Sequence, residues 1–259
     1  MFKNILLQFI PSFLLRKYKQ KKFYSLIKNF EIADEPDLVI AQKLCNPAQF
    51  VIDIGANIGL YSKFLSPLAS KIIAIEPVPF TFDILTNNMK QFDVENIHIY
   101  NQAISNQIGE TLITVPMQSG VRNYFRASIS DMVNEADSKY TLPIKTTTLD
   151  SLCLKIAANI SLIKCDIEGH ELECLQGSEQ ILNTAKPAWL IEVSGNPDKN
   201  DSSSYQVFEL LQGKGYRAFW FDGETLFERR PGDSSVNYFF LMDMHIDLLK
   251  YEKVNILEF

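Results

Sequence analysis

Two clusters of glycine and ionisable residues could do chemistry, and each follows a short apolar segment. The first cluster runs from Asp53 through Gly55 and Asn57 to Gly59. Glycines let the backbone approach a ligand, and the helix that starts beyond them presents free N–H groups. Glu76 ends the next apolar segment, 23 residues after Asp53, where a carboxylate can accept hydrogen bonds from both hydroxyls of a ribose. The first cluster therefore predicts a nucleoside site.

The glycine spacing favours S-adenosylmethionine over a dinucleotide. A GxGxxG loop aligned on Gly55 needs glycine at the positions of Asn57 and Leu60, and both differ. S-adenosylmethionine carries an ammonium and a sulfonium but no phosphate. The carboxylate of Asp53 suits such a cation and would repel a pyrophosphate. An NAD(P)-dependent oxidoreductase on the same fold is the alternative, and a strand-to-helix turn without a ligand is the third interpretation.

The second cluster contains Lys164, Asp166, Glu168 and His170, directly after another apolar segment. Burying unpaired charge is costly, so these residues cannot all belong to a core. The carboxyl ends of neighbouring parallel strands meet at a switch point, and we expect Asp166 and Glu168 there, facing the reactive end of the ligand. The alternative is a helix N-terminus whose acids favour the helix dipole. Glu192 ends a later strand and would complete an acidic rim.

The elements that must position these residues alternate from residue 50 onward. Strands are predicted at Phe50–Ile54, Lys71–Ile75, Ile97–Tyr100, Thr111–Val115, Leu142–Thr148, Leu162–Asp166, Trp189–Val193, Arg217–Phe221 and Asn237–Met242. A hairpin is predicted around 106–109, and helical periodicity fills most of the other gaps. No full crossover helix separates the last two strands, so they should be antiparallel. The pattern predicts an α/β fold, a doubly wound, mostly parallel sheet with an antiparallel C-terminal strand.

Length and composition exclude several classes of protein. The chain has 259 residues, of which 46% are hydrophobic and 22% charged, enough for a large core and unlike a disordered acidic tail. No apolar run is long enough to span a membrane, and the net charge of −6 argues against a general nucleic-acid binder. Four cysteines without CxxC spacing and three histidines predict buried thiols in a reducing compartment and no zinc site. No convincing signal peptide begins the chain, so we expect a cytoplasmic protein.

The charge is distributed unevenly along the chain. Residues 1–30 hold seven basic and no acidic side chains, whereas residues 31–259 hold 18 basic and 31 acidic ones. We expect residues 1–47 to form a basic, amphipathic helical extension and residues 48–259 to form the main domain. Apolar residues beside the basic run fit a helix lying on an anionic membrane, so residues 1–30 are a candidate for peripheral membrane contact. The alternative is a helix that packs on the domain with a solvated basic face.

Six motifs in order carry a resemblance to a known family. They are DIGANIG, IAIEPVP, NQAIS, TTTLDSL, LIKCDIEGHELECLQG and LIEVSG. With them the chain resembles the FkbM family of methyltransferases over roughly residues 48–221. The resemblance implies a class I, Rossmann-like fold, S-adenosylmethionine as methyl donor, and usually O-methylation of a hydroxyl on a sugar or natural product.

The resemblance also assigns residues to the cofactor. Asp53, Gly55, Asn57 and Gly59 match the family's cofactor loop, and Glu76 matches its ribose-binding acid. Ala103, within NQAIS, matches the stretch expected beside the adenine.

For the methyl end of the site, Asp166, Glu168 and His170 match the family's acidic motif and are, in that order, the candidate bases. Ser194-Gly195-Asn196 replaces a histidine that many relatives place there, which weakens any acid or base assignment in that loop. The clustered acids could instead hold Mg²⁺, which would lower the pKa of an acceptor hydroxyl, and both arrangements remain open.

The acceptor contacts are expected in the polar, irregular segment 116–140, a candidate substrate loop or lid. Arg122, Tyr124 and Arg126 lie there, and basic and aromatic side chains together could hold an anionic sugar. The sequence gives no prediction of the oligomeric state.

Overall fold

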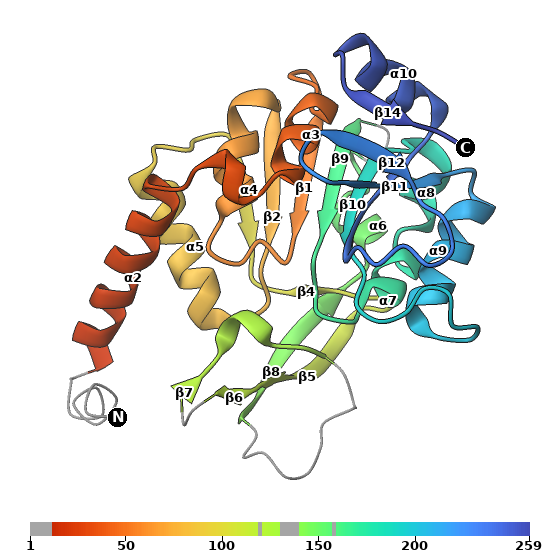
Figure 1. The fold of residues 1–259 in the computed structure, drawn as a ribbon. Helices are drawn as coiled ribbons and strands as arrows, with labels where there is room; N and C mark the ends of the chain where they lie inside the picture. The colour runs from red at the N-terminus through yellow and green to blue at the C-terminus, as the bar shows by residue number, and fades with distance from the viewer. Residues whose placement is uncertain (1–11, 119–120, 130–139, 157–158) are drawn as a thin grey trace.

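Short runs of β-branched and aliphatic residues form a nine-stranded sheet in the computed structural model, which describes residues 12–118, 121–129, 140–156 and 159–259 (Figure 1). In spatial order its strands are β14 (Asn255–Leu257), β12 (Thr225–Glu228), β11 (Arg217–Phe221), β13 (Asn237–Leu241), β10 (Ala188–Glu192), β9 (Ile160–Cys165), β1 (Phe50–Ile54), β2 (Lys71–Ile75) and β3 (Ile97–Tyr100). The five strands from β10 to β3 are parallel, whereas β13 runs antiparallel to both β10 and β11. The predicted fold class is therefore confirmed.

Helices cover both faces of this sheet, because its central strands are apolar on both sides. They are α2 (Ser12–Lys28), α3 (Asp37–Leu44), α4 (Leu60–Leu65), α5 (Pro79–Gln91), α6 (Leu149–Leu152), α7 (Glu171–Gln176), α8 (Glu179–Thr184), α9 (Ser203–Gly213) and α10 (Asp243–Tyr251). Ile52 and Ile54 of β1 face a core built with α6 to α9. Val51 of the same strand faces the opposite core, which α3, α4, α5 and α10 complete.

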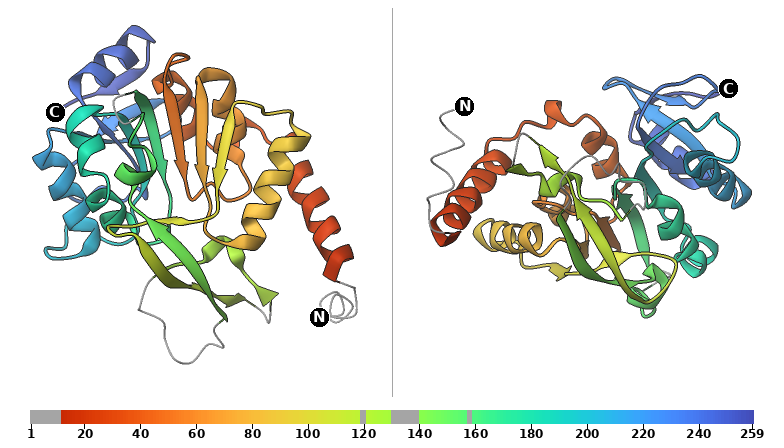
Figure 2. Two further views of the ribbon diagram at one scale, coloured as in Figure 1. Left: turned by 180° about the vertical axis from the view of Figure 1, so that it is seen from behind. Right: turned by 90° about the horizontal axis from the view of Figure 1, so that it is seen from below.

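A second, smaller sheet lies near the carboxyl ends of the central strands (Figure 2). It has the order β4 (Ala103–Ile104), β8 (Tyr140–Thr147) and β5 (Gly109–Val115). The hairpin predicted around 106–109 is wrong, because β4 and β5 each pair with β8 and not with each other. The short strands β6 (Met117–Gln118) and β7 (Val121–Arg122) and the 3-10 helix η3 (Tyr124–Arg126) follow β5.

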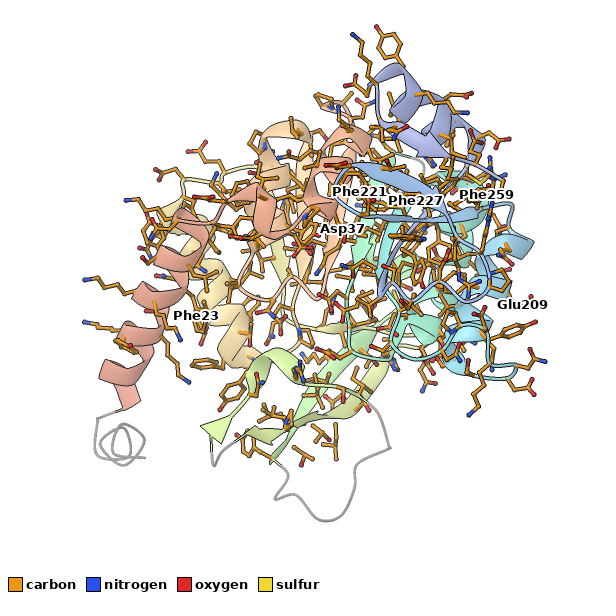
Figure 3. The ribbon with its side chains drawn as sticks, viewed as in Figure 1. Phe23, Asp37, Glu209, Phe221, Phe227 and Phe259 are labelled. Atoms are coloured by element: carbon orange, nitrogen blue, oxygen red, sulfur yellow. The ribbon has the colours of Figure 1, made fainter. Side chains whose placement is uncertain are left out.

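The N-terminal helix α2 packs along α5 (Figures 1 and 3). Phe23 and Ile27 are buried in this contact, and the ring of Tyr24 stacks on Phe92 at 4.6 Å between centroids. Most of the lysines of α2 are exposed on its outer side. The described part of α2 thus packs on the domain, as the alternative to membrane binding predicts. Membrane contact stays a prediction. Residues 1–11 lie outside the described residues. Among the described helices, none combines the length and apolar character that a membrane span requires.

The predicted domain boundary after residue 47 also stays a prediction. The helix α3, which precedes that boundary, contributes Leu38, Ile40, Ala41 and Leu44 to the core shared with α4 and α10. Residues 37–44 therefore pack as part of the main body.

Gly177, at the end of α7, offers a test of how closely this helix packs against the smaller sheet. A Cβ at this position would lie 2.1 Å from the backbone oxygen of Ser105, directly after β4. We expect Gly177→Ala to lower the free energy of unfolding by about 1–3 kcal/mol, because backbone must move to relieve the overlap. Gly213→Ala is the matched control, since Gly213 ends α9 with open space around it. Urea denaturation measures both, and equal stability of the two variants would contradict the expectation.

Candidate functional site

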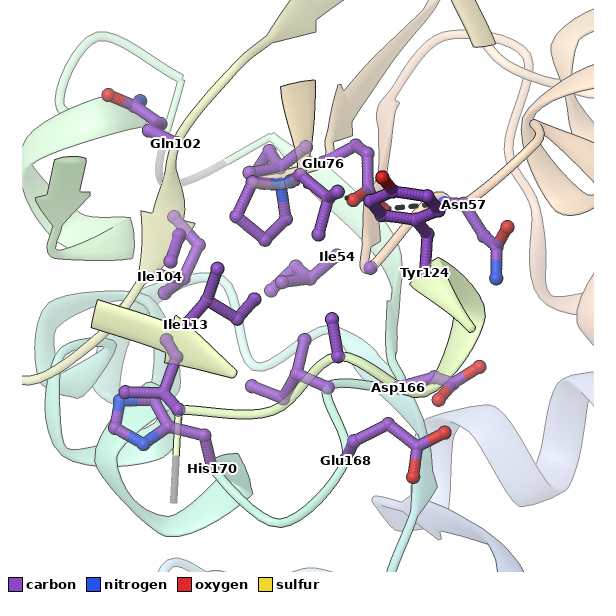
Figure 4. A pocket seen from close by; sticks show the side chains of 18 of the residues that line it. Ile54, Asn57, Glu76, Gln102, Ile104, Ile113, Tyr124, Asp166, Glu168 and His170 are labelled. Atoms are coloured by element: carbon purple, nitrogen blue, oxygen red, sulfur yellow. Dashed lines mark hydrogen bonds between the residues drawn. The ribbon is translucent and has the colours of Figure 1, made fainter. Parts of the chain in front are cut away.

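A cavity of about 120 Å³ lies where the carboxyl ends of β1, β2 and β9 approach the smaller sheet (Figure 4). One part of the wall is apolar and is formed by Ile54, Ala103, Ile104, Ile113, Ala127, Ile129 and Ile167. The carboxylates of Asp166, Glu168 and Glu192 form the other part. The cavity thus has an apolar half that suits a planar ring and an acidic half that suits a cation.

The glycine loop after β1 borders this cavity and lies against the end of β9. Gly55 has φ +72°, and a Cβ there would lie 1.8 Å from the carbonyl oxygen of Asp166, so only glycine fits. Asn57 also has positive φ and lines the cavity, and its side-chain Oδ1 is buried without a hydrogen-bond partner among the described residues. Gly59 does not line the cavity; it packs against Leu85 and Met89 of α5.

Glu76 directly follows β2 and lies against the glycine loop, with 6% of its surface exposed. Its Oε2 accepts a hydrogen bond from the backbone N–H of Asn57 at 3.0 Å, and its Oε1 accepts one from Val78 at 2.9 Å. Burial raises the pKa of Glu76 to about 7, although these two N–H groups oppose the shift. Each carboxylate oxygen keeps a second lone pair, so Glu76 can still accept from a diol in the cavity.

Asp53 is placed behind the loop and not on the cavity wall. Its Oδ2 accepts hydrogen bonds from the backbone N–H and the hydroxyl of Ser62, at 3.0 and 2.6 Å, and its Oδ1 is 3.8 Å from Nζ of Lys164. Asp53 and Lys164 are direct partners in the register of β1 and β9, so their side chains share one face of the sheet. Burial raises the pKa of Asp53, and Lys164 and Ser62 oppose that shift. Asp53 therefore contacts α4 and Lys164, and among the described residues its side chain is linked to the cavity through these two neighbours.

Lys164 is the residue whose role the sequence did not reveal. Its ammonium donates to the carbonyl of Gly55 at 3.3 Å and to Oδ2 of Asp166 at 3.1 Å, and its side chain is buried. Burial alone would lower the pKa of Lys164, but Asp166 and Asp53 more than offset this and raise it. One buried cation thus joins the glycine loop to the acidic half of the cavity. The signal available in the sequence was a lysine inside an otherwise apolar strand.

The acidic half places several carboxyl groups close together, so that each negative charge disfavours ionisation of its neighbours. The side chains of Asp166 and Glu168 point toward the same side of the cavity (Figure 4). Burial, with the charge of Asp166, raises the pKa of Glu168. Burial raises the pKa of Glu192 to about 7, and the charges of Asp166 and Glu168 add to the shift. Within the described ranges, no three His, Cys, Asp or Glu side chains form a group that could hold a metal ion, so nothing there supports the Mg²⁺ alternative.

His170 lies apart from these carboxylates. Its ring is near Ile113 in the apolar half (Figure 4). The Nε2 atom is 3.0 Å from the hydroxyl of Ser105, and Nδ1 is 3.5 Å from a carboxylate oxygen of Glu173. Burial lowers the pKa of His170, while Glu173 opposes this. The structure therefore brings Asp166, Glu168 and Glu192 together and leaves His170 on another wall.

The segment expected to contact an acceptor lies partly within the described residues. Tyr124 lines the cavity, and its ring lies 4.6 Å from that of Phe80 between centroids. Lys19 of α2 lies over both rings, with Nζ 4.7 Å from the centroid of Phe80. Arg126 is exposed, and its charge opposes the raised pKa of Glu168. The side chain of Arg122, like residues 119–120 and 130–139, lies outside the described part of the chain.

Comparison with known proteins identifies similar sequences. The Methyltransferase FkbM domain matches residues 53–218. The chain is 27% identical over 219 residues to methyltransferase sdnD from Sordaria araneosa, covering 70% of this chain and 80% of the relative. It is 27% identical over 157 residues to the hexuronic acid methyltransferase AglP from Haloferax volcanii, covering 58% and 57%.

Among solved structures, methyltransferase FkbM from Methylobacillus flagellatus aligns with a TM-score of 0.49 and 16% identity. The alignment covers 76% of this chain and 44% of that one. The chain therefore matches less than half of that solved protein and little more than half of AglP.

Proposed function

Since the chain belongs to the FkbM family of methyltransferases, we propose that it transfers a methyl group from S-adenosylmethionine to a hydroxyl of a sugar, glycolipid, polysaccharide or natural-product acceptor. The observation that carries the proposal is a single cavity with two kinds of wall. One side has apolar residues and Glu76, and the other has the carboxylates of Asp166, Glu168 and Glu192. AglP is a hexuronic acid methyltransferase, which supports a sugar as acceptor. Nothing in the comparisons supports the NAD(P)-dependent oxidoreductase alternative.

The residues of the cavity fit S-adenosylmethionine. Ala103, Ile104 and Ile113 offer an apolar surface for the adenine ring, and Glu76 can accept from the ribose hydroxyls. The Oδ1 of Asn57, which has no hydrogen-bond partner within the described part of the chain, can accept from a ribose hydroxyl or the ammonium group. The carboxylates of the acidic half can stabilise the positive charge of a sulfonium. When bound, S-adenosylmethionine supplies a methyl carbon attached to a positively charged sulfur.

In the proposed reaction, Asp166 is the base. The acceptor oxygen bonds to the methyl carbon as the carbon–sulfur bond breaks, and the hydroxyl proton passes to the carboxylate of Asp166. Lys164 donates to Oδ2 of Asp166 at 3.1 Å, which holds the carboxylate in place. Glu168 is the second candidate base. His170, the third, is the least suited, because the hydroxyl of Ser105 and the carboxylate of Glu173 already engage its two ring nitrogens.

Titration of the protein with S-adenosylhomocysteine at several pH values tests the cofactor part of the proposal. Glu76, with its pKa raised to about 7, is largely protonated in the free protein below that pH. Ribose hydroxyls donate to the charged form, so binding lowers this pKa, and affinity rises with pH up to about 7 and then levels off. Glu76→Gln should weaken binding at pH 8 by about 10- to 100-fold and flatten the dependence below pH 7.

Glu110→Gln is the control for this measurement, because Glu110 is exposed on β5 and does not line the cavity. Isothermal titration calorimetry gives all the affinities. Failure of the wild-type protein to bind, or equal binding by the two variants, would contradict the assignment of Glu76. Transfer of labelled methyl from S-adenosylmethionine into glycan and glycolipid fractions then tests the acceptor class.

A further inference from the structure

A second cavity of about 100 Å³ adjoins the first on the side of α4. It shares Asp166 and Glu192 with the first cavity. Its other polar lining residues are Glu35, Tyr61, Lys164 and Asn237. We propose that this second cavity is the acceptor pocket and that its charge selects a neutral polyhydroxylated acceptor over an anionic one. The inference rests on the methyl transfer proposed above.

The geometry of methyl transfer explains why an acceptor would occupy the second cavity. An in-line displacement requires the acceptor oxygen to approach the methyl carbon on the side away from the sulfur. The apolar half and Glu76 take the nucleoside in the proposed mode, so the acceptor must reach Asp166 from a different direction. Asp166 and Glu192 line both cavities. The proposed base therefore borders both cavities.

The lining offers hydrogen-bonding groups of both kinds, as a polyol requires. The phenol of Tyr61 donates to Oε1 of Glu35 at 2.9 Å, and the amide nitrogen of Asn237 donates to Oδ2 of Asp37 at 2.8 Å. Figure 3 shows Asp37 beside the strands of the C-terminal half. Sugar hydroxyls can donate to the carboxylates and accept from the ammonium of Lys164. The carboxylates and the ammonium can thus form hydrogen bonds with a neutral hydroxylated ligand, while the donors of Tyr61 and Asn237 already hold Glu35 and Asp37 in place.

The charges of the pocket disfavour an anionic ligand. Glu35 and Asp166 face it with carboxylates, and Glu192 with a carboxyl group whose pKa is raised to about 7, against the ammonium of Lys164. That ammonium is already offset by Asp53, 3.8 Å behind it, and by Asp166. A uronate or phosphate would add a like charge at close range, which is repulsive in a partly buried site. The pocket therefore opposes the anionic sugar suggested by Arg122 and Arg126.

Matched sugar probes test the inference in the full-length protein loaded with S-adenosylhomocysteine. The probes are methyl glycosides of common hexoses and the corresponding methyl uronosides, at millimolar concentration, detected by saturation-transfer NMR. We expect binding of neutral glycosides and weaker binding of each matched uronoside. Glu35→Lys should shift the preference toward the uronoside by about tenfold or more, because it reverses a charge at the pocket. Glu31→Lys makes the same change of net charge at an exposed residue outside the pocket and should leave the preference unchanged.

The outcomes separate this inference from the proposed function. Calorimetry on the same samples reports S-adenosylhomocysteine binding, and its absence would defeat the proposed function itself. If the cofactor product binds but no neutral glycoside does, or the uronosides bind better, the acceptor pocket is refuted. An unchanged preference in Glu35→Lys refutes it as well. Should Glu35→Lys fail to fold, Glu35→Gln replaces it, with a smaller shift expected in the same direction.

Discussion

Replacing Asp166 with asparagine should lower kcat for methyl transfer by about 10²- to 10⁴-fold, the usual contribution of a general base. Asparagine keeps the size of the side chain and an oxygen for the ammonium of Lys164, 3.1 Å away in the wild type, but it cannot take the hydroxyl proton. The affinity for S-adenosylhomocysteine should change much less than kcat, because the apolar half and Glu76 remain. Labelled methyl transfer into an active acceptor fraction, with calorimetry beside it, measures both quantities.

Two comparison variants make this expectation specific to Asp166. Glu168→Gln removes a carboxylate from the same half of the cavity and should reduce kcat less. His170→Asn alters the other wall, where the imidazole contacts Ser105, and should affect cofactor binding more than kcat. A kcat for Asp166→Asn close to that of the wild type would reject Asp166 as the base.

Lys164→Met should destabilise the protein by about 3–5 kcal/mol, because it leaves a buried charge without its partner. Asp53 has 1% of its surface exposed, and Lys164 is the cation that opposes its desolvation. In this variant Asp53 would be protonated at low pH, so stability should fall as the pH rises through the raised pKa of Asp53. Urea denaturation across a range of pH values measures the effect.

A double-mutant cycle supports or rejects that explanation. Asp53→Asn combined with Lys164→Met removes both charges, and we expect it to be more stable than Lys164→Met alone, with a marked coupling energy. Lys145→Met, at an exposed position of β8, is the control and should change stability by less than about 0.5 kcal/mol. A double variant no more stable than Lys164→Met would show that lost packing, and not charge, explains the effect.

The central strands could be predicted from the sequence because each is a short apolar run that ends in a turn. The predicted limits of β1, β2 and β3 agree with those in the structure. The smaller sheet could not be predicted, since β5 pairs with residues 140–147, about 30 positions away, whereas the hairpin signal is local. Pairing between distant segments depends on the whole fold.

The candidate site shows the same limit. The positions of the strand ends predicted that Gly55, Asn57, Glu76, Asp166, Glu168 and Glu192 would line the site, and the family resemblance added Ala103; all of them line the cavity. Asp53 differs because alternation along β1 turns its side chain to the face of Val51, where the register with β9 puts Lys164 beside it. No sequence pattern gives that register. For the same reason, the cavity shared by Glu35, Tyr61 and Asn237 could not be found from the sequence.

The position of β13 has a consequence for how such a chain can evolve. The family match ends at residue 218, yet β13 (Asn237–Leu241) lies between β10 and β11, both of which begin before that limit. A gene shortened to the matched region would therefore encode a sheet with a gap, in which β10 presents an open apolar edge that invites aggregation. Recombination can move this fold between genes intact only if the C-terminal segment that carries β13 travels with the matched region. The region matched by sequence is therefore smaller than the unit that must fold together.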